Sequence, residues 1–336
     1  MVRRQDLPPP LGARLLIITV TLNAALDRTL TVPNFQPGHR HRASQGVTLA
    51  GGKGINVARA LKLLGVPVIA TGLAGGRTGT RIVEELTAEA ILNDFVRISD
   101  ESRTSTAVVD PTVGSYTEIN EWGPKATAEE LEMLLEKLRY LGQGADYVVF
   151  AGSLPRGVED DFYAEAVRDL TRRGVEVVLD TDGEPLRLGT EAGPFLISPN
   201  QREAELLVGQ ELEDDADFLM ALDTIAELGA RNVHITLASG CFALFREDRQ
   251  VRRYRALSPP VEPVSTVGAG DVLLAAFLAA RIAGRPAGEA LRGAVAAGAA
   301  STLELGAGRF DPKEAVKLGP AVQVSELDRE SAAPIL

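Results

Sequence analysis

The chain alternates strand-like and helix-like segments along most of its 336 residues, and this alternation limits the possible folds more than any other feature. Short runs of β-branched and aliphatic residues, such as 15–21, 147–151 and 175–180, alternate with segments such as 54–64 and 161–173, in which apolar residues recur at helical spacing. Strands joined by helices form a largely parallel sheet covered on both faces. The sequence therefore predicts an α/β fold whose binding residues directly follow its strands, because ligands of such sheets lie at the carboxyl ends of the strands.

One domain, spanning residues 15–318, accounts for nearly all of this pattern. We expect a proline-containing leader at 1–14 and a C-terminal tail at 319–336 that frays from about Val322. Two short runs, 106–109 and 116–120, read as a pair of strands with a turn at Gly114.

Charge and composition exclude several classes of protein. The 35 basic and 46 acidic residues give a net charge of −11, which argues against a nucleic-acid binder. The single cysteine, Cys241, excludes an intrachain disulfide. No apolar run approaches the ~20 residues that span a bilayer, and Leu15–Val20 reads as a first strand rather than a signal peptide. We expect a cytoplasmic protein that binds neither nucleic acid nor membrane, and its three histidines lack zinc-site spacing.

The segment Ser265-Thr-Val-Gly-Ala-Gly-Asp271 leads directly into an apolar helical segment. Gly268, Ala269 and Gly270 would present backbone N–H groups at the start of that helix, an arrangement that binds anions. Asp271 lies in the first turn, where a carboxylate either caps the helix or takes a proton from a substrate hydroxyl.

A second glycine-rich segment, Ala50-Gly-Gly-Lys-Gly-Ile-Asn-Val-Ala58, also precedes a helix. Gly52 permits close approach of a ligand to the backbone, Lys53 can supply a charge to a phosphate, and Asn56 offers a donor and an acceptor to a polyol. The spacing differs from that of a Walker A loop. A lysine exposed to water on a loop is the alternative reading.

Three further segments place polar residues after strands. Asp27 follows the first strand and either binds sugar hydroxyls or caps a turn, and Ser153 follows the strand at 147–150. Asn200 and Glu203 are spaced i, i+3 and share one helix face. This pair either holds hydrated Mg²⁺ or caps the helix.

The order of these motifs resembles that of the ribokinase/PfkB family of carbohydrate kinases, and most closely its phosphosugar branch of 1-phosphofructokinase, tagatose-6-phosphate kinase and the minor 6-phosphofructokinase. The resemblance covers about Leu15 to Phe310. The residues that carry it are Leu22–Asp27, Gly51–Arg59, Gly152–Pro155, Asp180–Gly183, Pro199 and Asn200 with Glu203, and Ser265–Asp271.

This resemblance implies a ribokinase-like three-layer α/β/α domain with a largely parallel central sheet and a small β-sheet lid, formed by about 27–47 and 104–120. It implies that Asp271 is the catalytic base and that the amides of Gly268, Ala269 and Gly270 form an anion hole for the transferred phosphoryl group. The residues implied for the acceptor are Asp27, Gly52 and Asn56 for its hydroxyls, and Lys53, Arg103 and Ser153, with Arg40 or Arg42 from the lid, for its phosphate. Because the chain is acidic overall, we expect its positive charge to gather at this phosphate.

The resemblance also implies the cofactors ATP and Mg²⁺. Asn200 and Glu203 match the Mg–nucleotide side, with Glu203 holding Mg²⁺ through water, and Thr236, Ser239 and Gly240 match a loop beside the nucleotide. Three positions depart from the family pattern: Ser198 replaces a lysine before Pro-Asn, the glycines of Leu237–Phe242 are displaced, and Val272 follows the base. None of these departures touches the base or the anion hole.

The expected reaction is ATP-dependent phosphorylation of fructose 1-phosphate to fructose 1,6-bisphosphate, with tagatose 6-phosphate and fructose 6-phosphate as alternative acceptors. A sugar-phosphate sensor on the same fold is the non-enzyme alternative. A dinucleotide-dependent dehydrogenase is disfavoured, since no Gly-x-Gly-x-x-Gly follows the first strand. The resemblance further implies a homodimer through the lid. His39 and His41 alternate with Arg40 and Arg42, so both arginines would share one face of a lid strand.

Overall fold

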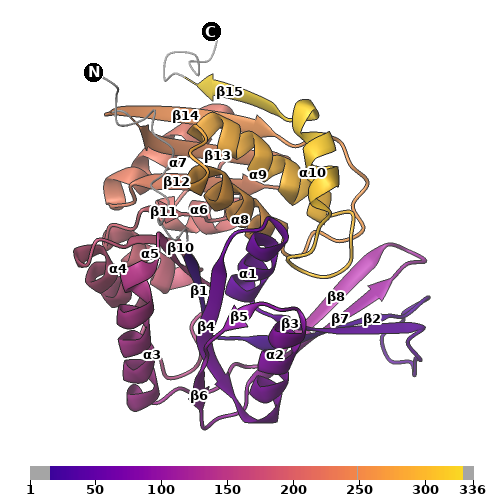
Figure 1. The fold of residues 1–336 in the computed structure, drawn as a ribbon. Coiled ribbons are helices and arrows are strands. Elements are labelled where there is room, and N and C mark those ends of the chain that lie inside the picture. The colour runs from indigo at the N-terminus through magenta and orange to yellow at the C-terminus, as the bar shows by residue number, and fades with distance from the viewer. Residues whose placement is uncertain (1–15, 248, 328–336) are drawn as a thin grey trace.

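A computed structural model describes residues 16–247 and 249–327, so the predicted leader at 1–14 and the end of the predicted tail lie outside the described residues. An 11-stranded sheet runs through the molecule (Figure 1). Its strands run in the order β15-β14-β13-β12-β11-β10-β9-β1-β4-β5, and β6 also pairs with β4. Their bounds are β1 (Ile17–Thr21), β4 (Val68–Gly75), β5 (Leu92–Asn93), β6 (Val96–Ile98), β9 (Tyr147–Ala151), β10 (Glu176–Asp180), β11 (Leu196–Ile197), β12 (Asn232–Leu237), β13 (Gly240–Glu247), β14 (Gln250–Leu257) and β15 (Gln323–Leu327).

Strand direction in this sheet confirms the predicted α/β fold. All pairings from β12 to β5 and β6 are parallel, and only β12-β13, β13-β14 and β14-β15 are antiparallel. The antiparallel strands follow the short turn at 238–239, which is too short for the helical crossover that a parallel pair needs.

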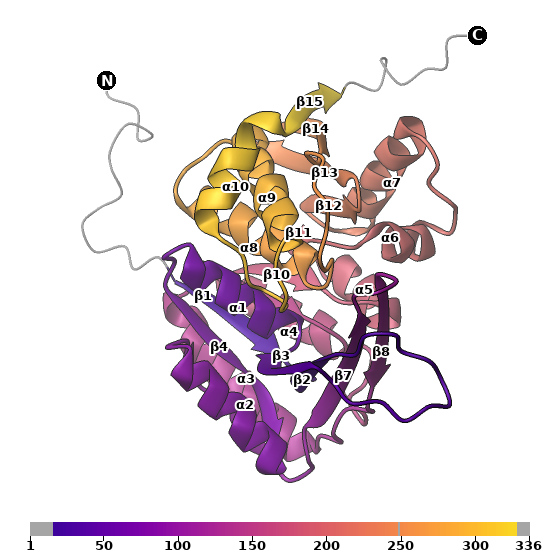
Figure 2. The same ribbon diagram turned by 90° about the vertical axis from the view of Figure 1, so that its right-hand side faces the viewer.

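Helices cover both faces of the sheet, and each face has its own apolar core (Figures 1 and 2). Neighbouring residues in β1 point to opposite faces, so Ile17 joins one core and Ile18 the other. The first core takes α1 (Lys53–Leu63), α2 (Gly76–Ala88), α8 (Ala269–Ile282), α9 (Ala287–Ser301) and α10 (Pro312–Leu318). The second core takes α3 (Ala128–Leu141), α4 (Phe162–Arg172), α5 (Gly183–Glu191), α6 (Gln201–Val208) and α7 (Asp215–Leu228). Two short 3-10 helices occupy Gly142–Gly144 and Gly319–Ala321.

A separate four-stranded sheet, which we call the lid sheet, projects from this body (Figure 1). It has the order β3-β2-β7-β8, with β2 (Ala25–Thr31), β3 (Gln45–Gly51), β7 (Arg103–Asp110) and β8 (Ser115–Asn120). β2 and β7 pair in parallel, and the other two pairings are antiparallel. The lid sheet therefore joins two segments that lie far apart in the sequence.

Two expectations about chain ends and loops are wrong. His39 to Arg42 form no strand, because Pro33, Pro37 and the left-handed Gly38 (φ 84°) interrupt extended structure between β2 and β3. Residues 323–327 do not fray, because β15 pairs with β14 at the sheet edge and Val324 packs against the first core. Within the described residues, no helix has the length and apolar character needed to cross a membrane.

Candidate active site

The sequence motifs converge on a cavity of about 350 Å³ beside the lid sheet, which we call the acceptor cavity. The motif residues come from the carboxyl end of the main sheet and from the starts of α1, α6 and α8, where the parallel-strand topology places ligand sites. Its lining comprises Asp27, Gly52, Lys53, Asn56, Arg103, Ser105, Glu118, Asn120, Asp180, Ser198, Asn200, Glu203, Thr236, Val267, Gly268, Gly270 and Asp271.

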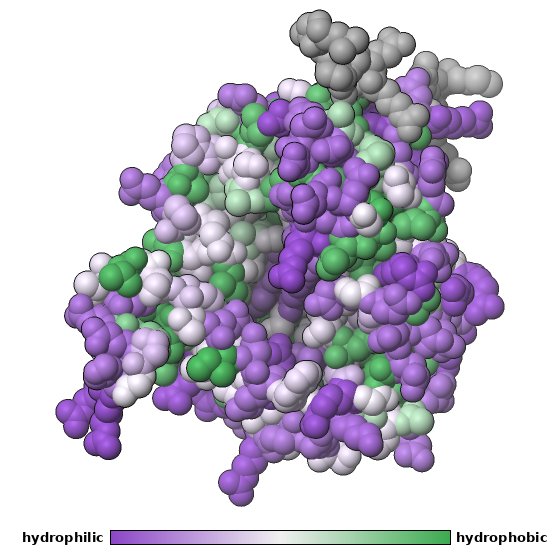
Figure 3. Space-filling model, turned by 180° about the vertical axis from the view of Figure 1, so that it is seen from behind, coloured by the Kyte–Doolittle hydropathy of each residue, from purple (hydrophilic) through white to green (hydrophobic). Residues whose placement is uncertain are grey.

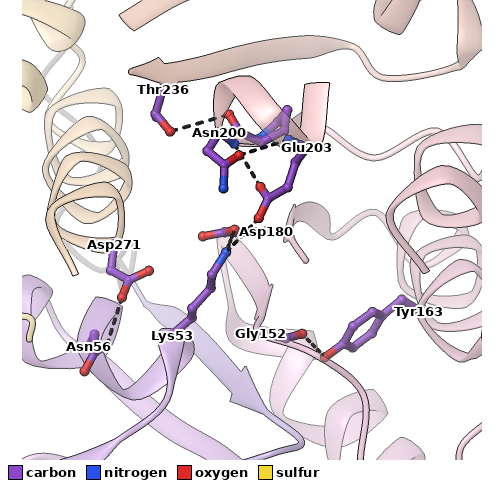
Figure 4. Close-up of polar contacts among 10 residues, drawn as sticks. Lys53, Asn56, Gly152, Tyr163, Asp180, Asn200, Glu203, Thr236 and Asp271 are labelled. Carbon is purple, nitrogen blue, oxygen red and sulfur yellow. Dashed lines mark hydrogen bonds and ion pairs between the residues drawn. The ribbon is translucent and has the colours of Figure 1, made fainter. Parts of the chain in front are cut away.

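Asp271 is held by a partner from the other end of the chain. It lies in the first turn of α8 and makes no cap, since the N-cap residue is Gly268 and no side chain caps this helix. Instead, Asn56 Nδ2 donates a hydrogen bond of 2.8 Å to Asp271 Oδ2 (Figure 4). Asp271 is only 5% exposed, and this burial, with the negative charge of Asp180, raises its pKa to about 7 despite the opposing effects of Lys53 and Asn56. A carboxyl group with such a pKa can accept a proton near neutral pH.

Gly268 gives α8 its starting geometry. Its φ of 80° lies in the left-handed region, and a Cβ here would lie 2.9 Å from Ala307 Cβ. The helix that follows turns the first-turn N–H groups at Ala269 and Gly270 toward its open end. This geometry suits the predicted anion hole, whose assignment stays a prediction.

Lys53 is paired with two carboxylates at the start of α1. Its Nζ lies 2.7 Å from Asp180 Oδ1 and 3.8 Å from Glu203 Oε1 (Figure 4). Burial by itself would lower the pKa of Lys53, but Asp180, Glu203 and Asp271 outweigh that effect and raise it. Sequence reasoning gave Asp180 no role, although its place at the end of the buried strand β10 was a usable signal.

Asn200 and Glu203 cap α6 reciprocally. Glu203 N–H donates to Asn200 Oδ1 at 2.9 Å, and Asn200 N–H donates to Glu203 Oε2 at 2.8 Å. Both residues also line the acceptor cavity, so capping and exposure to a ligand occur together. Thr236 lies beside Asn200, because the Thr236 N–H donates to the carbonyl of the residue before Asn200, Pro199, at 2.9 Å. Burial raises the pKa of Glu203, although Lys53 opposes this shift.

Arg103 and Ser153 meet through Asn23. Arg103 Nε donates to the Asn23 carbonyl at 3.4 Å, and Asn23 Nδ2 donates to Ser153 Oγ at 3.1 Å. Tyr163 Oη donates to the Gly152 carbonyl at 2.9 Å and so holds the loop after β9 (Figure 4). These contacts leave the Arg103 guanidinium at the wall of the acceptor cavity.

Asp27 lies within β2 of the lid sheet and not at the end of the first strand. Its carboxylate packs against Gly51, where a Cβ would lie only 1.9 Å from Asp27 Oδ2, so a larger residue there would displace the carboxylate. Burial raises the pKa of Asp27 to about 6, with Arg103 lowering it and Glu118 raising it. Gly52, with φ 111°, is required, since its Cβ would meet Thr21 Cγ2 at 2.7 Å.

A second, larger cavity of about 830 Å³ adjoins the first. We call it the nucleotide cavity because it is lined by the residues that the sequence analysis expects beside a nucleotide. It shares Asn200, Thr236 and Gly270 with the acceptor cavity, so the start of α8 lies where the two meet. The remaining lining is largely apolar and includes the predicted loop residues Ser239 and Gly240, and also Leu257, Pro259, Pro260, Leu273 and Val295. Figure 3 shows a hollow among mostly hydrophilic side chains on the face turned away from the viewer in Figure 1.

Four further residues considered in the sequence analysis lie outside the acceptor cavity: Arg40, Arg42, His234 and Cys241. Arg40 and Arg42 sit on the exposed loop between β2 and β3 and do not line the acceptor cavity, which corrects their expected place beside the acceptor phosphate. His234 is buried against Phe277, and burial lowers its pKa to about 3. Cys241 is also buried, and burial raises its thiol pKa to about 12, as suits a structural residue.

Besides Asp180, the sequence analysis also missed the lining residues Ser105, Glu118 and Asn120, of which the last two lie on β8. Both belong to the strand predicted at 116–120, and their spacing of two residues places them on one face of β8. The sequence signal was therefore present, but the direction of that face depends on how β8 pairs with β7.

Comparison with known proteins gives consistent matches. A family model described as pfkB family carbohydrate kinase matches residues 18–314. The 1-phosphofructokinase of Borreliella burgdorferi is 34% identical over 289 residues, which are 86% of this chain and 92% of that protein. The 1-phosphofructokinase of Bacillus subtilis is 34% identical over 314 residues, 93% of this chain and 100% of that protein. The Escherichia coli phosphofructokinase-2 solved with fructose-6-phosphate has a TM-score of 0.83 at 30% identity, covering 91% of this chain and 98% of that one, and a tetrameric inhibited form of the same enzyme is also known.

The raised pKa of Asp271 predicts a pH-dependent difference in stability between wild type and Asp271→Asn. The folded chain keeps a proton on Asp271 that the unfolded chain loses between its ordinary pKa of 3.8 and about 7. This contribution to stability is therefore complete at low pH and declines as the pH rises through 7. We therefore compare the Tm of Asp271→Asn with that of the wild type by calorimetry. The Tm of the variant minus that of the wild type should be at least about 2 °C higher at pH 8 than at pH 5. An equal Tm difference at both pH values would contradict the assignment.

Proposed function

This chain belongs to the pfkB family of carbohydrate kinases, and we propose that it transfers the γ-phosphoryl group of ATP to fructose 1-phosphate, giving fructose 1,6-bisphosphate. As a member of that family it is a phosphotransferase with an alcohol acceptor. The observation that carries the proposal is the buried Asp271 carboxylate, which lines the acceptor cavity next to Gly270, the residue of α8 that lines both cavities. At this position a hydroxyl bound in the acceptor cavity can approach the terminal phosphate of a triphosphate bound in the nucleotide cavity.

In the proposed reaction, Asp271 accepts the proton of the acceptor hydroxyl. The hydroxyl oxygen forms a bond to the γ-phosphorus as the bond from that phosphorus to the bridging oxygen of ADP breaks. Asn56 donates to Asp271 Oδ2, which orients the carboxylate so that its other oxygen faces the cavity. The N–H groups at the start of α8 and the Lys53 ammonium would stabilise the negative charge on the phosphoryl oxygens.

The fit of Mg²⁺ rests on Asp180 and Glu203. Both carboxylates reach the Lys53 ammonium, so their oxygens already converge on one positive charge. No cluster of three or more His, Cys, Asp or Glu that could hold a metal occurs among the described residues. Two carboxylates suit an ion that keeps several waters and takes its remaining ligands from nucleotide phosphates. Bound there, Mg²⁺ would neutralise phosphate charge, and Lys53 would add a second positive charge between nucleotide and acceptor.

The acceptor is placed by charged side chains of both signs that line its cavity. Arg103 and Lys53 line the cavity and offer donors to the phosphate that the sugar already carries, whereas the predicted Ser153 does not line it and reaches this site only through Asn23. Asp27 and Asn56 offer acceptor oxygens to the sugar hydroxyls. Lys53 contacts Asp180 and Glu203, so its ammonium serves both phosphates rather than the sugar phosphate alone.

Fructose 1-phosphate is favoured because relatives that cover most of the chain are 1-phosphofructokinases. Fructose 6-phosphate is the alternative that the E. coli complex suggests, and tagatose 6-phosphate is the third acceptor of the same chemistry. Comparing kcat/KM for the three acceptors tests the proposal, and we expect the highest value with fructose 1-phosphate.

The variant Asp271→Asn should fold at least as well as the wild type, and its kcat should be about 10²–10⁴-fold lower. Near-normal turnover by this variant would contradict the role of Asp271.

Arg103→Ala should weaken the binding of the sugar phosphate without affecting ATP. Loss of charge-assisted hydrogen bonds to a phosphate corresponds to roughly a 10–100-fold rise in KM for the acceptor. Arg97→Ala is the matched control, because Arg97 lies on β6, does not line the acceptor cavity, and donates from Nη1 to Thr80 Oγ1 at 3.4 Å. Steady-state kinetics with each substrate varied in turn measures both values, and an unchanged acceptor KM in Arg103→Ala would refute the assignment.

We also infer a homodimer through the lid sheet. Ile119 is 62% exposed on the face of β8 opposite Glu118, and Trp122, just after β8, is 85% exposed. Apolar surface of this kind marks interfaces between proteins. Light scattering should give twice the chain mass of 35.7 kDa for the wild type and the single mass for Ile119→Asp. A wild type that is monomeric at micromolar concentration would contradict the inference, and the Tm of the variant serves as its folding control.

A further inference from the structure

We propose that Glu118 is a specificity-determining residue that accepts a hydrogen bond from a ring hydroxyl of the acceptor sugar. Glu118 lies on β8 of the lid sheet and has been assigned no role so far. The inference rests on the proposed function, which it extends from the class of acceptor to the group that recognises one of its hydroxyls.

Strand register places Glu118 on the same face of the lid sheet as Asp27. Across the sheet, Asp27 is opposite Ser105, and two residues further along β7 Ala107 is opposite Glu118. Residues two apart in a strand share a face, so the Glu118 carboxylate and the Asp27 carboxylate project from one side of the sheet. Both residues line the acceptor cavity, and both also line a smaller cavity of about 50 Å³ beneath the lid sheet.

The Glu118 carboxylate is positioned but not neutralised. Ser105 Oγ donates a hydrogen bond of 3.2 Å to Glu118 Oε1. Among the residues that the structure describes, no lysine, arginine or histidine forms an ion pair with Glu118. The nearby Arg103 donates instead to the Asn23 carbonyl and to Asn120 Oδ1. Glu118 therefore keeps acceptor capacity for a donor that enters the cavity.

The negative charge of Glu118 contributes to the raised pKa values of two neighbouring groups, Asp27 and Tyr116. Burial raises the pKa of Asp27 to about 6, and the charge of Glu118 adds to that rise. Burial also raises the pKa of Tyr116 to about 12, and Glu118 and Asp27 both contribute. Two carboxylates that face one cavity repel each other and are relieved by hydroxyl donors. A polyol supplies such donors, whereas a phosphate group would add further negative charge.

This charge arrangement fixes the orientation of the sugar in its cavity. A phosphate on the acceptor is attracted to Arg103 and Lys53 and repelled by Glu118 and Asp27, so the acceptor binds best with its phosphate at the two cations and its hydroxyls at the two carboxylates. Glu118 thus selects ring hydroxyls by attraction and rejects a reversed sugar by repulsion. Because its partner is a hydroxyl, a sugar that lacks that hydroxyl should lose the benefit of Glu118 altogether.

The experiment compares wild type and Glu118→Ala with the ketohexose phosphate that the wild type uses best and with three analogues lacking the hydroxyl at C2, C3 or C4. With the parent sugar we expect Glu118→Ala to lose about 10–100-fold in kcat/KM, with KM for ATP unchanged. With one of the analogues, the kcat/KM of the wild type should be lower than with the parent sugar by a similar factor. For that analogue, Glu118→Ala and the wild type should have the same kcat/KM. The two losses coincide because the hydroxyl and the carboxylate act as one pair.

Glu121→Gln is the matched control, since Glu121 follows β8, accepts the Thr104 N–H at 2.8 Å and does not line the acceptor cavity. It should behave like the wild type with all four sugars. Equal losses by Glu118→Ala on every sugar, or no loss on the parent sugar, would overturn the role of Glu118 while leaving the kinase proposal intact. If the wild type phosphorylates no ketohexose phosphate, the proposed function is wrong and the role of Glu118 fails with it.

Discussion

The hydrogen bond between Asn56 and Asp271 joins residues that are 215 positions apart, and the arrangement of the site depends on it. Asn56 is oriented by Arg59, whose Nη1 donates to Asn56 Oδ1 at 3.3 Å and so leaves the amide nitrogen to face Asp271. Arg59 is buried, and its charge is balanced by Glu89, whose carboxylate takes bonds of 2.5 and 2.9 Å. Arg59 also donates to the carbonyls of Ala50 and Ala307. Since an unpaired buried charge is strongly destabilising, this network holds α1, the end of β3 and the loop before α10 in one arrangement around Asp271.

The electrostatics of the site resemble those of the whole chain, because carboxylates outnumber cations in both. Asp27, Glu118, Asp180, Glu203 and Asp271 line the acceptor cavity with only Lys53 and Arg103 as cations. This excess, together with burial, raises the pKa values of Asp27 and Asp271. Two anionic substrates fit here only if cationic groups, helix N–H groups and a metal ion face their phosphates while hydroxyls face the carboxylates. Burial and the same charges thus raise the pKa of Asp271 to about 7, as its proposed role as a base requires.

Local signals in the sequence predicted the elements well. The alternation of strand-like and helix-like segments corresponds to the parallel sheet and the helices that cover it. Predictions that depended on pairing between distant segments were less successful. Residues 323–327 read as a fraying tail because their few apolar side chains gain stability only against β14 and α9. The alternation of His39 to Arg42 reads as a strand, but a strand needs a partner, and Pro37 and Gly38 lead the chain away from β2.

The sequence by itself determined the fold class, the family and the motif residues around Asp271 and Lys53, because glycine spacing, helix starts and strand ends are local properties. Only the tertiary structure decided what those residues contact. It paired Lys53 with Asp180 and Glu203, turned Asp271 toward Asn56 rather than toward the helix end, and placed Glu118 in the wall of the acceptor cavity. These outcomes depend on burial, which shifts the pKa of Asp271, and on strand register, which decides the face that Glu118 occupies. Neither burial nor register is a property of any single segment, so both arise only when distant parts of the chain pack together.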